Sequence, residues 1–526
     1  MIYLVCPGTK QEAASIVAAA LRRSCGYSQV SVISASRWRS MLDRDQSMVC
    51  VVIDPLENWA ELIIRTHNAH NAKLLVFGTL PPSLAHYLGA VVEPLSPDVQ
   101  VGAKCDPAPI YSSTESPLHV VYRRPIGDIA CPIPDRAFLR YDFSDEWNNL
   151  GFGAIRADGS VWAWSNMVRV RPQDSVADVT LGDTVVSDYA ALWDTPLASL
   201  LWFNRSVGPV DSQEWRLIEV FLAHYRYTNL PCCPVLSEVP YGYAAAVTMR
   251  MDCDEDIESA RPLWQVYAEM GVPFSLAIHT QVLADRRHYA LPREVVARNG
   301  AVLSHTATHA QDWGGSYEAA FTEATMSAKA IEGVIGKPVH YAVSPFHQTP
   351  AYARAALADA GYKGCVGGII RNDPDFVMAR AGAPPSSPLD FIGHSQQCML
   401  HGDCVLGGVD QLAGFKKAFD IAREGRAFFG YLDHPFSARY QYGWTTEEQR
   451  IHAHRDFISY IRHYSGVLFA NESDALDFIG YAARIEVSTC GVQFKIDAPV
   501  GQVALWPVAV EYRGVSHALS SDGLVL

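Results

Sequence analysis

Residues 244–254 read Ala-Ala-Ala-Val-Thr-Met-Arg-Met-Asp-Cys-Asp, so that an apolar run leads directly into two carboxylates. A short apolar run of this kind predicts a buried strand. Asp252 and Asp254 then fall where the strand ends and a loop begins. Catalytic groups of α/β barrels come from the C-terminal ends of the strands. The stretch therefore predicts one strand of a parallel α/β fold with functional carboxylates at its end.

Two later segments repeat this pattern. His305 and His309 follow the apolar run at 301–303, and His434 follows the run at 428–432. If the first segment forms a helical turn, the four-residue spacing places both rings on one face, where they can hold one cation. A catalytic zinc site takes three protein ligands and keeps a position for water. One aspartate and two histidines fill that number, which leaves the other aspartate free to act as a base.

The composition is that of an ordinary globular protein. The 526 residues suffice for roughly three or four domains. Apolar residues make up 49% and charged residues 19%, which argues against disorder. The net charge is −14 and no block of Lys or Arg occurs, so we expect no nucleic-acid partner. The twelve cysteines show no regular framework, and we expect most to be reduced thiols.

The first residues, Met1-Ile2-Tyr3-Leu4-Val5, contain no basic segment followed by a long apolar one. They are too short an apolar run for a signal peptide or a membrane span. We therefore expect a first strand, no membrane span and a cytoplasmic protein. An exported protein remains the alternative if a longer form of the chain carries a leader.

The N-terminal part predicts two units. Residues 1–100 alternate strand-like and helical runs, which predicts a flavodoxin-like, doubly wound α/β domain that 196–230 would complete. The turn at 7–10 would hold a phosphate or be an ordinary tight turn. Residues 101–195 predict a β-rich module inserted into that domain. Its aromatic residues would bind sugar rings or pack in a core; they include Tyr122, Trp147, Trp162 and Trp164.

The C-terminal part predicts a barrel and a tail. Residues 240–475 repeat strand and helix, which predicts a parallel (β/α) barrel. Helices are expected at 317–335 and 351–360. Residues 480–526 contain alternating apolar and polar runs, which predict a short β module.

With these motifs in order, residues 240–475 resemble the polysaccharide deacetylases, the NodB homology superfamily of carbohydrate esterase family 4 type. The separation of the two aspartates by Cys253 resembles the divergent exopolysaccharide-deacetylase subgroup with Asp-x-Asp. The resemblance implies a distorted barrel with fewer than eight complete strand–helix units. It also implies a role for each motif residue: Asp252 as catalytic base, Asp254, His305 and His309 as metal ligands, and His434 as general acid.

The third motif departs from the family pattern. The family carries Arg-x-Pro, whereas Val343 stands where the arginine would be and is followed by Ser344-Pro345-Phe346-His347. Arg250 lies two residues before Asp252 on the predicted strand, so both side chains point to one face and Arg250 can orient the base. Arg371 is the second candidate, and a base without an arginine is the third. His347 is a further candidate ligand.

Several residues are candidates for contact with substrate. Pro345 and Phe346 come from the third motif, and Phe436, Tyr440 and Trp444, with Tyr442 between them, follow His434 closely. These aromatic side chains would form a platform for sugar rings or pack under the rim of the barrel. His394 and His401 flank a Gly-rich stretch that would line the cleft or be a solvated loop.

We therefore expect a hydrolase that removes acetyl groups from N-acetylated amino sugars in a polysaccharide or its precursor. Its cofactor would be a divalent metal, most simply Zn²⁺, and its partner an N-acetylated amino-sugar polymer or oligosaccharide. Two alternatives remain open. One is a metal amidohydrolase that acts on a small non-sugar amide. The other is an inactive carbohydrate-binding or scaffold protein whose altered third motif reflects lost catalysis.

Overall fold

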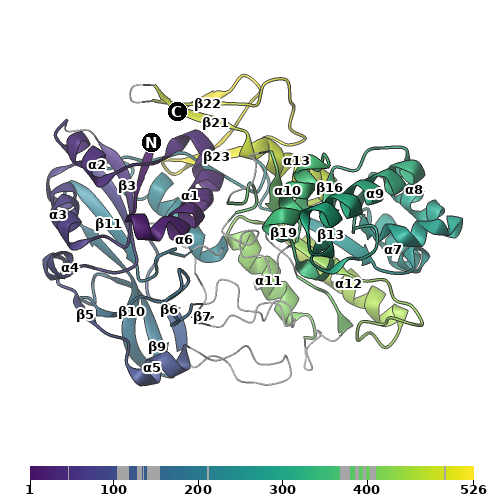
Figure 1. The fold of residues 1–526 in the computed structure, drawn as a ribbon, viewed down its shortest axis with the longest axis horizontal. Coiled ribbons are helices and arrows are strands. Elements are labelled where there is room, and N and C mark those ends of the chain that lie inside the picture. The colour runs from purple at the N-terminus through teal and green to yellow at the C-terminus, as the bar shows by residue number, and fades with distance from the viewer. Residues whose placement is uncertain are drawn as a thin grey trace.

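The structure of this protein is a computed structural model, shown in Figure 1. It describes residues 1–44, 47–103, 118–126, 133, 135–138, 155–209, 212–367, 380–385, 390–394, 398–402, 410–490 and 493–526. Arg371 and Trp147, which the sequence singled out, lie outside these ranges.

The first body is built on a mixed sheet in the order β2-β1-β3-β4-β11-β10-β9-β6-β7. In this order, the first five strands, β2, β1, β3, β4 and β11, run parallel to one another. The remaining strands, β10, β9, β6 and β7, pair in antiparallel fashion. Their bounds are β1 Ile2–Val5, β2 Val30–Val32, β3 Met48–Ile53, β4 Ala72–Phe77, β6 Leu118–Tyr122, β7 Arg136–Ala137, β9 Ser175–Leu181, β10 Thr184–Asp194 and β11 Ala198–Phe203. Every residue of β3, β4 and β11 is buried, as in parallel strands covered on both faces.

Helices pack on both faces of this sheet. One apolar core joins it to α1 (Gln11–Cys25) and α6 (Ser212–Ala223). A second core joins the other face to α2 (Ala35–Leu42), α3 (Ala60–Ala69) and α4 (Pro82–Leu88). The first body is therefore a three-layered α/β unit.

The region predicted as a separate β module supplies β6, β9 and β10, which extend the first sheet instead of forming one of their own. Trp164 is 1% exposed and packs edge-on against Phe138, with ring centroids 5.5 Å apart. For Trp164, the core interpretation is thus correct and the sugar-binding interpretation is wrong.

The second body contains a parallel sheet in the order β18-β17-β16-β15-β14-β13-β19, with β20 paired to the first half of β13. The strand bounds are β13 Ala245–Cys253, β14 Ser275–Ile278, β15 Ala301–Ser304, β16 Tyr341–Val343, β17 Gly364–Val366, β18 Ile392–His394, β19 Phe428–Asp433 and β20 Val467–Ala470. The helices are α7 Arg261–Met270, α8 Ala290–Ala297, α9 Tyr317–Ile335, α10 Ala351–Asp359, α11 Ala413–Glu424, α12 Glu447–Arg462 and α13 Glu472–Ala483.

The second sheet curls until its edge strands, β18 and β19, approach each other. The ring of His394 donates from Nε2 to the carbonyl oxygen of Phe428 at 2.9 Å, and its Nδ1 lies 3.2 Å from Glu472. His394 is fully buried in β18. It therefore ties the two edges together, and neither interpretation of it as a cleft or loop residue is correct.

Strand β13 pairs with β14, β19 and β20, and its side chains alternate between two environments. Met249, Met251 and Cys253 belong to the apolar core shared with the surrounding helices. Arg250 and Asp252 alternate with them and point to the opposite face, as the two-residue period of a strand requires. The strand therefore carries its polar residues on the inner side of the curled sheet.

The C-terminal segment contributes to two small antiparallel sheets, and β21 and β22 lie along the upper edge of the molecule in Figure 1. One contains β21 (Glu486–Cys490), β22 (Gln493–Asp497) and β25 (Leu524–Val525). The other pairs β12 (Val235–Leu236) with β23 (Ala509–Tyr512) and β24 (Val515–Ala518). No helix in the described part of the chain is long and apolar enough to cross a membrane.

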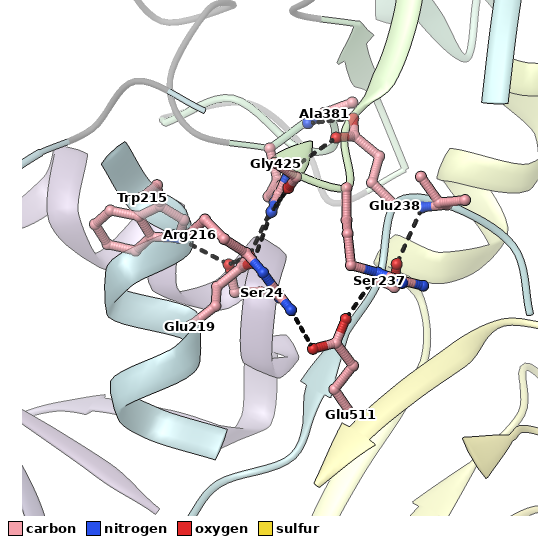
Figure 2. Close-up of polar contacts among 12 residues, drawn as sticks. Ser24, Trp215, Arg216, Glu219, Ser237, Glu238, Ala381, Gly425 and Glu511 are labelled. Carbon is pink, nitrogen blue, oxygen red and sulfur yellow. Dashed lines mark hydrogen bonds and ion pairs between the residues drawn. The ribbon is translucent and has the colours of Figure 1, made fainter. Parts of the chain in front are cut away.

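A buried network of charges joins the two bodies and this C-terminal segment (Figure 2). Glu219 of α6 accepts hydrogen bonds from Arg380 Nε at 2.9 Å and Nη2 at 2.7 Å. Arg216 pairs with the same carboxylate at 3.1 Å and with Glu511 of β23 at 2.6 Å. Arg380 also lies 3.8 Å from Glu238. The bodies are therefore held together by paired charges withdrawn from water.

Candidate metal centre

The strand ends of the second sheet bring Asp254, His305 and His309 together. Asp254 follows β13, and the two histidines follow β15. Asp254 Oδ1 lies 3.3 Å from Nε2 of His305 and 3.3 Å from Nε2 of His309. Donor atoms 3.3 Å apart are close enough that one cation could bind them all with bonds of about 2.1 Å.

The tautomer of His305 favours a cation between its Nε2 atom and Asp254. His305 donates its Nδ1–H to the carbonyl oxygen of Val343 at 3.0 Å, so a neutral ring presents the lone pair of Nε2 to Asp254. A lone pair and a carboxylate oxygen repel each other unless a cation or a proton lies between them. Within the described chain, no hydrogen bond reaches the buried Oδ1 atom of Asp254. The donor set therefore fits a divalent metal ion.

The electrostatics of these residues agree with that fit. Burial alone would raise the pKa of Asp254. His434, which carries charge only in the acidic range where this carboxyl titrates, and the contacts of His305 and His309 lower it well below its usual value. Burial would lower the pKa of His305, but Asp254 and Asp252 raise it. Because the site stabilises positive charge next to an ionised carboxylate, it attracts cations.

The segment from His305 to His309 forms a loop after β15, at the strand-to-loop position that the sequence predicted. It is not a helical turn, the conformation in which the four-residue spacing would place both rings on one face. Thr306 and His309 have φ values of 64° and 58°, which interrupt a right-handed helix. Glu323 of α9 holds the loop by accepting the backbone N–H groups of Ala307 at 2.8 Å and Thr308 at 2.9 Å. The two rings still converge, because the loop folds back on itself.

The candidate base, Asp252, is gripped by Arg250. Arg250 Nε donates to Asp252 Oδ1 at 2.6 Å, and Nη2 donates to Oδ2 at 3.2 Å. Both side chains are 3% exposed. Burial would raise the pKa of Asp252, but Arg250, assisted by His305, lowers it to about 2. Arg250 thus lies where the sequence argument placed a substitute for the missing third-motif arginine.

The candidate acid, His434, follows β19 and lies beside the same carboxylate. Its Nε2 is 3.7 Å from Asp254 Oδ2, and its Nδ1 shares a 2.7 Å hydrogen bond with Nε2 of His401. Burial, reinforced by His401, lowers the pKa of His434 to about 4. His434 is therefore uncharged at neutral pH in this arrangement.

His401 and Asp433 also belong to the site: the sequence named His401 as a residue of the cleft or of a solvated loop, and it assigned no role to Asp433. His401 is 8% exposed, so its interpretation as part of a solvated loop is wrong. Asp433 accepts the backbone N–H of His434 at 2.7 Å and the ring N–H of His454 at 3.0 Å. His401, Asp433 and His434 also carry close donor atoms, but a 2.7 Å separation of ring nitrogens is that of a hydrogen bond. No spacing in the sequence indicates that these residues meet.

The third motif supplies one wall of the site. Phe346 is 39% exposed, and its ring lies 4.8 Å from that of His309. Pro345 is buried beneath it. His347 is also buried, and burial lowers its pKa to about 3. Among the described residues, His347 is not part of the donor group around Asp254.

The proposed aromatic platform divides into exposed and buried members. Tyr440 is 39% exposed, whereas Trp444 is 3% exposed and belongs to the apolar core. Phe436 is half-buried and packs against the same core. Trp444 therefore packs in the core, as one of the two interpretations expected.

The comparisons with known proteins find similarity of structure alone. No protein-family model and no curated protein matches this chain. A family 4 acetyl xylan esterase from Clostridium thermocellum, solved with a cobalt ion, is 11% identical, with a TM-score of 0.30 over 44% of this chain and 90% of the other. The Puue allantoinase is 13% identical, with a TM-score of 0.35 over 47% and 92%. A CE4 family pseudoenzyme from Bacillus anthracis is 12% identical, with a TM-score of 0.31 over 44% and 66%. At these scores, the similarities do not decide between an active enzyme and an inactive one.

Proposed function

We propose that this protein is a metal-dependent hydrolase that removes acetyl groups from N-acetylated amino sugars in a polysaccharide or its precursor. The observation that carries the proposal is the convergence of two histidine nitrogens on one oxygen of Asp254. A second carboxylate, held ionised by Arg250, lies in the same strand end. The sequence resemblance to polysaccharide deacetylases over 240–475 supports the same conclusion. We also propose that the curled second sheet is the incomplete barrel of that family.

The residues fit the roles that amide hydrolysis requires. Asp254, His305 and His309 would hold Zn²⁺ or a similar ion, which would polarise the acetyl carbonyl and lower the pKa of an attacking water. Asp252 accepts the proton of that water, and Arg250 fixes the orientation of its carboxylate. A backbone N–H near Phe346 stabilises the negative charge that develops on the acetyl oxygen.

His434 delivers a proton to the departing amine in this proposal. Because His434 is uncharged at rest, it must first take up a proton from solvent. Asp252 releases the proton of the attacking water to solvent at the end of the cycle. Negative charge on the acetyl oxygen raises the pKa of a nearby imidazole, which favours proton uptake by His434 as the tetrahedral species forms. The C–N bond then breaks, and acetate and a free amine leave. Phe346 and Tyr440, both exposed beside the centre, offer apolar faces to a sugar ring.

A metal analysis combined with an acetate-release assay tests this function. The purified protein should contain about one zinc-like ion per chain, and it should release acetate from N-acetylated oligosaccharides. The His309→Ala variant is the control, because loss of one of three ligands removes the ion and the activity. Release from small non-sugar amides alone would identify an amidohydrolase instead. Absence of any hydrolysis by the metal-loaded protein would identify a binding or scaffold protein.

A further inference from the structure

Tyr442 connects the metal-binding carboxylate to the candidate acid. Its phenol donates a hydrogen bond to Asp254 Oδ2 at 3.0 Å. Its ring lies flat on the ring of His434, with centroids 4.2 Å apart and planes at 19°. It also lies 5.0 Å from the ring of His401. One side chain therefore contacts two residues to which the proposed function assigns different roles.

The backbone of Tyr442 is held in an unfavourable conformation by a neighbouring loop. Its φ value is 48°, a left-handed conformation that non-glycine residues adopt at a cost. The backbone N–H of Gly402 donates to the carbonyl oxygen of Tyr442 at 2.9 Å. A Cβ atom at Gly402 would lie 2.2 Å from the carbonyl carbon of Gly443, so only glycine permits this approach. Packing of the two loops thus determines the position of the phenol.

The two carboxylate oxygens of Asp254 have different partners, and the phenol of Tyr442 is one of them. Oδ1 faces His305 and His309, while Oδ2 accepts from Tyr442. Without that hydrogen bond, the carboxylate could rotate about its terminal torsion, which is broad for aspartate. Rotation would separate Oδ1 from the histidine nitrogens or turn both oxygens towards the ion. Hydrogen-bond partners of this kind orient metal ligands, and their loss typically costs about 10–100-fold in metal affinity or activity.

We propose that Tyr442 is a positioning residue of the metal centre. Its phenol holds Asp254 so that one oxygen is presented to the ion, and its ring holds His434 beside the same carboxylate. This inference rests on the proposed function, because it assumes that Asp254 binds a metal ion. It does not require Tyr442 to touch the substrate.

Zinc affinity of the full chain tests the role of the phenol. Tyr442→Phe removes only the hydroxyl and keeps the ring on His434. Zinc should bind this variant 10–100-fold more weakly than the wild type, as measured by competition with a chelating dye. Tyr317→Phe is the matched control, because Tyr317 also donates to a carboxylate, that of Asp359 at 2.7 Å, but on the surface of α9. Its zinc affinity should equal that of the wild type.

The ring is tested by Tyr442→Leu at saturating zinc. This variant should bind zinc as Tyr442→Phe does but release acetate more slowly, with kcat lowered and KM unchanged, because His434 has lost its support. Equal rates for the two variants would overturn the role of the ring. Wild-type zinc affinity in Tyr442→Phe would overturn the role of the phenol. A wild-type protein that binds no zinc would instead overturn the proposed function itself.

Discussion

Replacement of Arg250 by methionine tests the electrostatic design of the site most directly. Arg250 is the principal group that opposes the effect of burial on Asp252, and the pKa of Asp252 is about 2. An ordinary aspartate has a pKa of about 3.9, so the difference of roughly two units corresponds to about 2.5 kcal/mol. In Arg250→Met, burial is no longer opposed by the guanidinium, and the pKa of Asp252 should rise above its ordinary value.

The assay is the pH dependence of kcat/KM for acetate release, which reports the ionisation of the free enzyme. In the wild type, Asp252 stays ionised across the accessible pH range, and any acidic limb comes from other groups. In Arg250→Met, kcat/KM should fall on the acidic side of the profile as Asp252 becomes protonated. The midpoint of that fall should lie about two or more pH units above the wild-type pKa near 2. Metal content should be unchanged, because Arg250 donates its two hydrogen bonds to Asp252, which is not one of the proposed ligands. Arg250→Lys keeps the charge but loses the two-pronged contact, and its limb should lie between the other two.

Stability provides a second, independent measurement of the same interaction. A carboxylate with a depressed folded-state pKa stabilises the protein above its unfolded pKa, near 3.9, and this contribution is lost as pH falls towards 2. Arg250→Met should therefore unfold more easily at pH 7, by about 3–5 kcal/mol, because it leaves a buried charge unpaired. The deficit should shrink on acidification, when Asp252 becomes neutral. A variant whose pH–rate profile coincides with that of the wild type would refute the argument, and the arginine role would pass to Arg371.

Three further predictions concern the proposed metal ligands, the proposed acid His434 and the buried charge network that joins the two bodies. Asp254→Asn should lose both metal and activity, whereas Asp252→Asn should keep the metal and lose activity; the reverse result, seen by elemental analysis, would exchange their roles. His434→Ala should slow hydrolysis less for amides with better leaving groups, and equal slowing across a leaving-group series would mean that His434 is structural. Glu219→Ala should destabilise the protein by about 3–5 kcal/mol in denaturant titrations, because it removes the carboxylate that accepts two hydrogen bonds from the buried guanidinium of Arg380. Arg380 and Arg216 lower the pKa of Glu219 despite its burial, so the stability that Glu219 contributes should be lost as pH falls below the ordinary carboxyl range. A variant as stable as the wild type at pH 7 would show that the network contributes nothing to stability.

Local patterns in the sequence predicted those parts of the fold that depend on local physics. The helix expected at 317–335 is confirmed as α9. Ser316 accepts the N–H of Ala319 at its start, and Gly336 ends it with a φ value of 69°. The pairing of Arg250 with Asp252 was also accessible, because the period of a strand places both on one face. In each case, residues close in sequence determine the result.

Contacts between distant loops could not be predicted in this way. Tyr442 and His401 reach His434 because the segments at 398–402 and 440–443 pack against each other, and neither segment has a period that predicts the other. The burial of Trp444 also depends on distant contacts. Its aromatic neighbours in the sequence suggested a surface platform, but in the structure Trp444 packs in the apolar core. The convergence of His305 and His309 does not come from a helical spacing, because Glu323, from the distant helix α9, holds the loop between them.

The backbone conformation shows where this chain departs from its local preferences. Among the described non-glycine residues with positive φ are Thr306, His309, Phe346, His347 and Tyr442, which all lie in loops around Asp254 or His434. Each such conformation costs about 1–3 kcal/mol, and it persists only where the surrounding structure determines it. Glycine would relieve that cost but could not supply an imidazole, a phenyl ring or a phenol. The positive φ values near Asp254 and His434 therefore indicate that these positions require their side chains, since glycine would serve the backbone better.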